Sequence, residues 1–293
     1  MVSKKEILNY YKYRGLNDIF NKLEKINYAI IKGEPLSILA YGEKGIRTYN
    51  DIDILVSKKN LLKVSGILRE KAKVEENLTR EEKILLYSLS HQIQPINIIY
   101  KNITINIDLN YDILWGEYKG QPIDIEEFLS DNIQMNIYGC CIKTLTPLKA
   151  FIQLCLHNYK DLNSVFILAS RHKISLSSFK DIYNLLINNL DKISIDELYN
   201  KCKKYKILPY IYYILFYTNK IYKNNIIDKY VQSFKTSEGV SLLNSYGLNN
   251  KERKEWRISF QDRLKCENLY DIIKSDLTEK DISKIKINKK IFN

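Results

Sequence analysis

The hydrophobic pattern of the chain changes near residue 146, and this change constrains the fold more than any other feature of the sequence. Before that point, short runs rich in β-branched residues alternate with stretches of helical spacing. After Pro147, helical spacing continues to the end of the chain. Period-two runs indicate strands, and periods near 3.6 indicate helices. The sequence therefore predicts an α+β protein, with a small mixed-sheet domain over residues 1–145 and an all-helical domain over residues 146–293.

Local signals place the elements within each part. In the first part we expect a helix from residue 58 to about 73, and strands at 28–31, 51–56, 96–100, 103–109 and 136–145. In the second part we expect helices at 148–159, 177–189, 195–204 and 209–222.

Basic residues are concentrated in the second part. The formal net charge is +12, and residues 147–293 hold 26 Lys and Arg against 15 Asp and Glu. Such an excess favours a polyanionic partner, with RNA as the first candidate. The alternative is compositional drift, because the whole chain is rich in Lys, Ile and Asn.

Cysteine usage and hydropathy bear on the compartment. The five cysteines are irregularly spaced and form no C-x-x-C pair, which argues against a disulfide framework or a zinc site and favours a reducing cytoplasm. The N-terminus lacks the apolar run of a signal peptide, and the apolar run 207–217 is too short and too tyrosine-rich to span a bilayer. We expect a cytoplasmic protein with no membrane partner.

Three acidic residues lie on two predicted strands. Asp51 and Asp53 would share one face of their strand, because residues two apart point the same way. Asp108 would lie on the polar face of the strand 103–109. If the two strands are neighbours, three carboxylates meet, and such a cluster can hold two divalent metals about 4 Å apart. Mg²⁺ is the preferred ion, with Mn²⁺ as the alternative.

The acidic pair has a second interpretation. A D-x-D pattern is short and common, and taken alone it is more often a solvated strand edge than a metal site. The context favours the metal: a Lys-Gly turn at Lys32-Gly33 follows a strand upstream, and Arg47 lies four residues before Asp51.

These residues also carry a family resemblance. Ile30-Ile-Lys-Gly-Glu-Pro-Leu36, followed by Tyr41, Arg47 and Asp51-Ile-Asp-Ile-Leu-Val56, resembles the uncharacterised nucleotidyltransferase family of the DNA polymerase β superfamily. The resemblance implies a polymerase β-like palm for the first domain. Two positions depart from the family pattern: Glu34 stands where a small residue is usual, and Asn110 stands where a histidine is usual.

The resemblance implies roles for the residues that match. Asp51 and Asp53 would bind the metal that bridges the phosphates, and Asp108 would bind a second metal and assist deprotonation of the acceptor. The nucleotide-binding residues would be Lys32, Gly33, Arg47 and Lys149.

The helical part offers weaker candidates. His157 and Lys160 would share one helical face and line a cleft. Asp181 would orient one of these basic groups. A lone helical histidine is more often a structural residue, so both interpretations of His157 stay open.

The leading functional hypothesis is transfer of a nucleoside monophosphate from a nucleoside triphosphate such as ATP to an acceptor hydroxyl. The acceptor could be anionic, such as tRNA or another RNA, or a protein, peptide or small molecule. One alternative is a nucleic-acid-binding or scaffold protein on a degenerate nucleotidyltransferase core, which Glu34 and Asn110 motivate. The other is a toxin that modifies tRNA.

Overall fold

The chain forms two compact units. The computed structural model describes residues 4–47, 49–72, 79–80, 86, 90–116, 118–171 and 173–292. The first unit comprises Met1–Gly116, Pro122–Gln153 and Leu185–Lys192, and the second comprises Glu117–Gln121, Leu154–Asn184 and Ile193–Asn293. The predicted boundary at residue 146 falls just before the helix α6 (Pro147–Asn163), whose first turns belong to the first unit.

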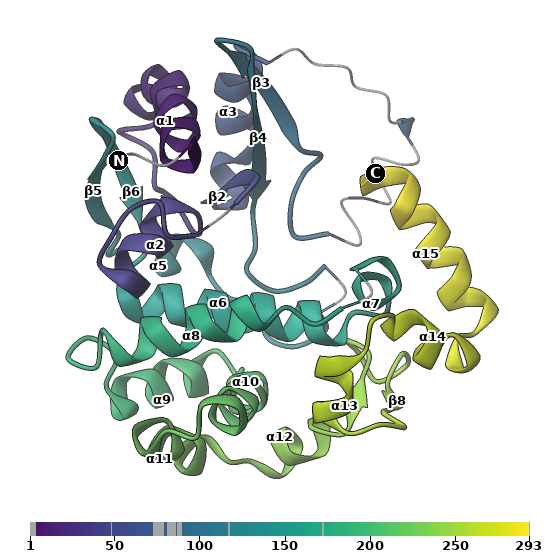
Figure 1. Cartoon of the computed structure of the whole chain (residues 1–293). Helices are drawn as coiled ribbons and strands as arrows, with labels where there is room; N and C mark the ends of the chain where they lie inside the picture. The colour runs from purple at the N-terminus through teal and green to yellow at the C-terminus, as the bar shows by residue number, and fades with distance from the viewer. Residues whose placement is uncertain are drawn as a thin grey trace. The chain divides into compact units, whose positions relative to one another are not determined.

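A six-stranded mixed sheet forms the centre of the first unit (Figure 1). Its strand order is β3-β4-β2-β1-β6-β5. β2 runs parallel to β4 and β1 runs parallel to β6, while the other neighbours are antiparallel. The strands are β1 (Tyr28–Ile30), β2 (Asp51–Val56), β3 (Ile96–Tyr100), β4 (Ile103–Asn110), β5 (Ile133–Ile137) and β6 (Cys140–Thr144).

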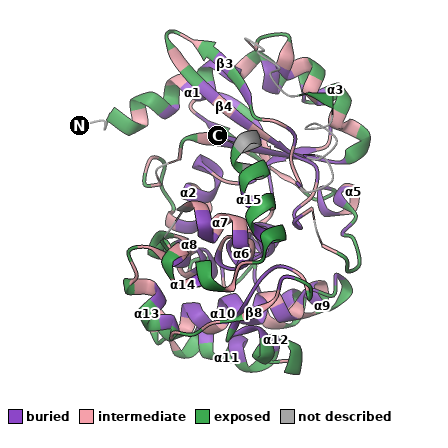
Figure 2. Cartoon of the chain, turned by 90° about the vertical axis from the view of Figure 1, so that its right-hand side faces the viewer, coloured by how far each residue is buried: buried purple, intermediate pink, exposed green. Residues whose placement is uncertain are grey.

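Two helices cover the apolar face of this sheet. α1 (Lys4–Lys22) contributes Leu16 and Phe20 to the core, and α3 (Lys58–Arg69) contributes Val64 and Leu68. They pack against the isoleucines of β2 and β4, whose alternation puts every second side chain into this core. Their outer surfaces are largely exposed (Figure 2). Two shorter helices of this unit are α2 (Glu34–Tyr41) and α5 (Ile125–Phe128).

The structure corrects one predicted strand and limits one predicted helix. Residues 136–145 do not form a single strand but belong to the hairpin β5–β6. The chain reverses at Tyr138 and Gly139, which have φ angles of 52° and 76° and so turn tightly. α3 ends at Arg69, and its expected end near Lys73 lies outside the described residues.

The second unit is helical, as the sequence predicts. It also contains a two-stranded ribbon, β7 (Ser245–Tyr246) and β8 (Lys254–Glu255), which is too short to produce a period-two signal. The four predicted helices correspond to α6, α8, α9 and α10. Besides α6, the helices are α7 (Val165–Arg171), α8 (Leu176–Ile187), α9 (Ile195–Lys204), α10 (Leu208–Tyr222), α11 (Asn225–Phe234), α12 (Ser237–Leu242), α13 (Phe260–Lys265), α14 (Leu269–Ile273), the 3₁₀ turn η1 (Lys274–Asp276) and α15 (Glu279–Phe292).

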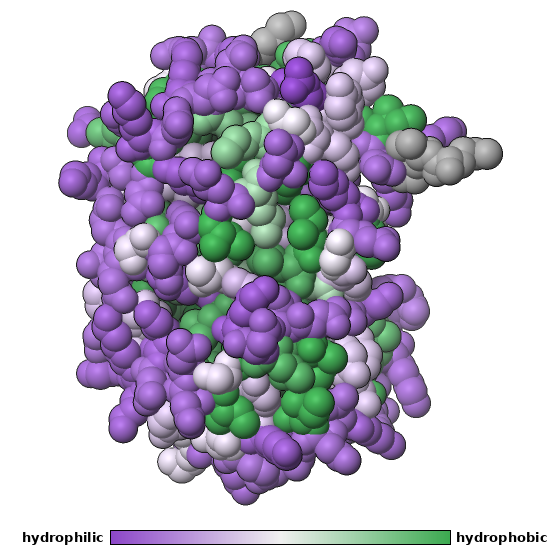
Figure 3. Space-filling model, turned by 90° about the vertical axis from the view of Figure 1, so that its left-hand side faces the viewer, coloured by the Kyte–Doolittle hydropathy of each residue, from purple (hydrophilic) through white to green (hydrophobic). Residues whose placement is uncertain are grey.

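Surface hydropathy and the cysteines complete the description of the fold, and the cytoplasmic location stays a prediction. Hydrophilic side chains cover most of the side shown in Figure 3, and hydrophobic side chains gather in separate areas. Among the described residues, no helix is long and apolar enough to cross a membrane. All five cysteines are free thiols.

Candidate functional site

The register of β2 and β4 brings the three predicted acids to one face of the sheet. Asp53 lies directly opposite Asp108, and Asp51 lies opposite Asn106. Because the intervening isoleucines point into the core, the carboxylates project from the other face. Asp53 is 4% exposed, whereas Asp51 and Asp108 are half-buried. The three side chains come from two parallel strands that the fold holds side by side.

Lys32 reaches this acidic centre from the end of β1. Its Nζ donates to Oδ1 of Asp53 over 3.0 Å, and both side chains are largely buried. The backbone of the same segment is fixed by a hydrogen bond from the amide of Ile31 to the carbonyl of Asp53, at 3.1 Å. Lys32 therefore compensates part of the negative charge of the cluster.

Burial and neighbouring negative charges raise the proton affinity of Asp108. Burial, followed by the charges of Asp53 and Asp51, raises the pKa of Asp108 to about 6. Lys32 and a hydrogen bond from Gln92 act in the opposite direction. A cation placed among these oxygens would favour the ionised carboxylate.

Carboxylates are suitable ligands for a hard divalent cation, but these carboxylates are not arranged around one point in this structure. Within the described ranges, no three His, Cys, Asp or Glu side chains are gathered so as to hold a metal ion. Carboxylate oxygens are the ligands that Mg²⁺ prefers. After burial, the charges of Asp53 and Asp51 contribute to the raised pKa of Asp108, and Lys32 offsets them only in part. A metal on Asp53 would require the ammonium of Lys32 to move off that carboxylate.

Gly33 adopts a backbone conformation that favours glycine. Its φ and ψ angles are 66° and −133°, and it caps the N-terminus of α2. A Cβ at this position would meet the ring of Tyr49 at 3.4 Å. The structure thus supplies a physical reason for glycine beside Lys32, namely a sharp turn between β1 and α2.

Glu34, which departs from the family pattern, is fully buried. Its Oε1 accepts hydrogen bonds from Nδ2 of Asn9 at 2.7 Å and from the hydroxyl of Tyr138 at 2.8 Å. Its Oε2 accepts from the amide of Gly45 at 2.8 Å. Both oxygens are hydrogen-bonded inside the protein, so neither is available to contact a bound phosphate chain.

Sequence reasoning missed two polar residues of α1. Asn9 and Lys12 are each 4% exposed and lie on the same side of the helix as the core residue Leu16. Lys12 donates from Nζ to the carbonyls of Tyr49 and Asn50, at 3.3 Å and 3.1 Å. Polar residues that continue the apolar stripe of an amphipathic helix are a signal that could have revealed them.

The remaining predicted residues of the first unit lie in different surroundings. Arg47 is half-buried in the segment that leads to β2. Asn110 is buried and donates from Nδ2 to the carbonyl of Asp108 at 3.1 Å, so it braces β4. Lys149 is also buried, where it pairs with Asp131 and donates to the carbonyl of Glu127 at 3.3 Å. The structure therefore does not bring Lys149 to the three acids.

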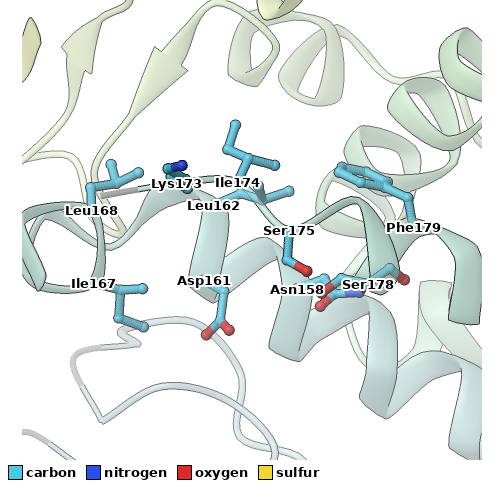
Figure 4. Close-up of a pocket in the computed structure, with 10 residues that line it drawn as sticks. All are labelled: Asn158, Asp161, Leu162, Ile167, Leu168, Lys173, Ile174, Ser175, Ser178 and Phe179. Atoms are coloured by element: carbon cyan, nitrogen blue, oxygen red, sulfur yellow. Dashed lines mark hydrogen bonds between the residues drawn. The ribbon is translucent and has the colours of Figure 1, made fainter. Parts of the chain in front are cut away.

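The candidates of the helical part belong to the second unit. Nε2 of His157 lies 3.4 Å from Oδ2 of Asp161, and Nζ of Lys160 lies 3.8 Å from Oδ1 of the same carboxylate. Asp181 is buried in α8. Asp161 and Lys173 are among the residues that line a cavity of about 50 Å³ (Figure 4). That volume suits a few water molecules rather than a nucleotide.

The fold and the site together define an α+β protein with an acidic centre on one face of a mixed sheet. The model of the uncharacterised nucleotidyltransferase family matches residues 3–223, and the chain belongs to this family.

Solved structures and curated proteins were also compared. A proposed nucleotidyltransferase from Thermotoga maritima is 18% identical, with a TM-score of 0.28 over 45% of this chain and 75% of that one. An antigenic nucleotidyltransferase-like protein from Paracoccidioides brasiliensis is 14% identical, with a TM-score of 0.30 over 64% of this chain and 78% of that one. The comparison with curated proteins gives no match.

Proposed function

We propose that this protein transfers a nucleoside monophosphate from a nucleoside triphosphate to an acceptor hydroxyl. The observation that carries the proposal is the placement of Asp53 beside Asp108 on parallel strands, with Asp51 on the same face. These three carboxylates would move together to hold Mg²⁺, or Mn²⁺, and three acids can serve two ions. The metal would neutralise phosphate oxygens and stabilise the charge that develops in an in-line displacement.

Lys32 has two successive partners in this scheme. Without substrate, its ammonium lies on Asp53 at 3.0 Å. When the triphosphate arrives, the ammonium passes to a phosphate oxygen and Asp53 becomes available as a ligand. Arg47 would bind a second phosphate oxygen, bidentately if its guanidinium is suitably turned. Gly33 would let the backbone approach the phosphate chain closely.

Asp108 is the candidate base. Without a metal, its pKa of about 6 leaves the carboxylate mainly ionised at neutral pH, and a bound cation would hold it in the ionised form that accepts a proton. The acceptor oxygen would lose its proton to Asp108 and form a bond to the α-phosphorus, while the bond from that phosphorus to the bridging oxygen breaks. Pyrophosphate is then the leaving group.

Charge supports an anionic acceptor. Residues 147–293 carry 26 Lys and Arg against 15 Asp and Glu, an excess that suits tRNA or another RNA. A protein, peptide or small-molecule hydroxyl is the alternative acceptor. The scaffold hypothesis rested on Glu34 and Asn110. Glu34 no longer supports it, because its carboxylate accepts hydrogen bonds from Asn9, Tyr138 and Gly45 inside the protein.

The test combines binding and transfer. In a binding experiment, the wild-type protein and the Asp51→Asn/Asp53→Asn variant are titrated with magnesium and a non-hydrolysable triphosphate. In a separate transfer assay, both proteins are incubated with α-labelled triphosphates and total cellular RNA or protein. We expect label on an acceptor with the wild type, and at least a hundredfold loss of triphosphate affinity in the variant. Equal affinities would refute the proposal. Salt-sensitive RNA binding without transfer would favour the scaffold, and growth arrest that depends on Asp51 would favour a toxin.

A further inference from the structure

Two buried polar residues of α1 are hydrogen-bonded to two segments beside the proposed site, the turn at Gly33 and the residues just before Asp51. Asn9 and Lys12 lie one turn apart, and burial of an amide and an ammonium is costly unless both are paired. Asn9 bonds to Glu34, the residue after Gly33. Lys12 bonds to the carbonyl of Asn50, the residue before Asp51. Each contact thus ends beside a residue of the proposed site.

Glu34 joins three separate segments to the start of α2. Its donors are Asn9 from α1, the hydroxyl of Tyr138 from the β5–β6 turn, and the amide of Gly45, which lies two residues before Arg47. A fully buried carboxylate with three donors has little freedom to reorient. These three hydrogen bonds to Glu34 therefore also restrict the adjoining turn at Gly33, whose φ is 66°.

Lys12 fixes the entry to β2 by a different device. Its ammonium donates to two successive carbonyls, those of Tyr49 and Asn50, and lies 5.2 Å from the centroid of the Tyr49 ring. These partners are carbonyl oxygens rather than a carboxylate. The ammonium therefore fixes the direction of the backbone just before Asp51.

From these contacts we infer that Glu34 and Lys12 are positioning residues of the proposed site. Glu34 sets the backbone at Gly33 for the triphosphate, and Lys12 sets the direction of Asp51 for the metal. Neither residue touches a ligand. The identity of the two ligands rests on the proposed function, whereas the backbone effect can be measured without them.

The Glu34→Gln variant tests the first half. Gln keeps the shape but replaces one acceptor with a donor, so one of the three hydrogen bonds fails. We expect the affinity for a magnesium–ATP analogue to fall about tenfold and the affinity for Mn²⁺ alone to stay within about twofold. The Asn9→Asp/Glu34→Gln variant reverses the polarity of one bond and should recover most of the loss. Tyr138→Phe removes a single donor and should give a smaller loss in a folded protein.

The Lys12→Met variant tests the second half. Met has a similar length and leaves the carbonyls of Tyr49 and Asn50 without the ammonium. We expect the affinity for Mn²⁺, followed by electron paramagnetic resonance, to fall about tenfold, even though loss of a positive charge that acts on Asp51 by itself favours the cation. A rise in Mn²⁺ affinity would overturn this half of the inference, because charge and not backbone position would then govern Asp51. The Lys22→Met variant removes a charge from the other end of the same helix, where Lys22 pairs with Glu70 at half-exposed positions, and should change neither affinity.

Amide hydrogen exchange separates failure of this inference from failure of the proposed function. Without any ligand, exchange should rise at Gly45 and its neighbours in Glu34→Gln, and next to Asp51 in Lys12→Met. Unchanged exchange in both variants would overturn the inference, whatever the ligands do. A parallel loss of both affinities in both variants, with fast exchange throughout, would also overturn it, because a general loss of stability would explain that pattern. A wild-type protein that binds neither ATP nor Mn²⁺ would refute the proposed function alone.

Discussion

The two faces of the β2–β4 pair differ in chemistry, although successive residues of the same strands point alternately to one face and the other. One face holds the isoleucines and leucines that pack against α1 and α3, and these side chains are nearly inaccessible to solvent. The other face holds Asp51, Asp53 and Asp108. The first face gains free energy from burial, whereas the second places like charges close together.

This difference separates the stability of the protein from its proposed activity. Apolar burial favours folding, but the acidic cluster opposes it until a cation compensates the charge. Lys32 supplies part of that compensation through its 3.0 Å contact with Asp53. Substitutions on the apolar face should therefore change mainly the free energy of unfolding, and substitutions on the acidic face should change mainly ligand binding.

The largest expected effect on stability comes from the apolar face. Ile54 is fully buried, follows Asp53 on β2 and lies opposite Leu109 of β4. The Ile54→Ala variant should lower the free energy of unfolding by about 3–4 kcal/mol, because it loses apolar contacts and leaves a cavity. Urea unfolding measures this change. The folded fraction should bind Mn²⁺ and triphosphate normally, and a loss of metal binding in fully folded variant would contradict the separation of the two faces.

Alternation explains how much of the site the sequence could predict. The bounds of β2 follow from its period-two pattern, and the same pattern puts Asp51 and Asp53 on one face. That β4 lies parallel to β2, with Asp108 opposite Asp53, is a tertiary fact that the pattern leaves open. The family resemblance, rather than the periodicity, provided the expectation that these two strands are neighbours.

The partners of polar residues inside the core were beyond local reasoning. Glu34 looked unfavourable beside a phosphate chain because nothing near it in sequence indicates Asn9 or Tyr138 as its donors. Lys149 shows the opposite case: the resemblance placed it near the nucleotide, but it pairs with Asp131. The partner of a buried charge depends on contacts between distant segments, which one sequence does not specify.

A smaller stability effect, of opposite sign, is expected on the acidic face. A carboxyl whose pKa rises to about 6 on folding binds its proton more tightly in the native state, so its contribution to stability falls as pH rises from about 4 to 6. The Asp108→Asn variant lacks this loss. Its free energy of unfolding should equal that of the wild type near pH 4 and exceed it by about 2 kcal/mol at pH 8. This figure is reduced to allow for solvent screening of the half-buried side chain.

Urea unfolding at several pH values measures the effect of Asp108→Asn. A magnesium–triphosphate complex should stabilise the wild type at pH 8 more than it stabilises the variant, because the variant keeps Asp51 and Asp53 but has lost one metal ligand. Equal stability of the two proteins at all pH values would mean that neither burial nor the charges of Asp53 and Asp51 raise the pKa of Asp108.

The smallest effect, and the most specific one, concerns the ammonium of Lys32, which follows β1 and contacts Asp53 on the acidic face. In the Lys32→Met variant, Asp53 no longer has an ammonium at 3.0 Å, so Mn²⁺ alone should bind about fivefold more tightly. The triphosphate loses a phosphate partner, so its affinity should fall about tenfold. The two ligands thus respond in opposite directions to one substitution. Lys71→Met removes an exposed lysine that pairs with Asp18 and should leave both affinities unchanged. If Mn²⁺ affinity falls in Lys32→Met, the ammonium supports the metal site instead of competing with it, and the exchange of partners proposed for Lys32 is wrong.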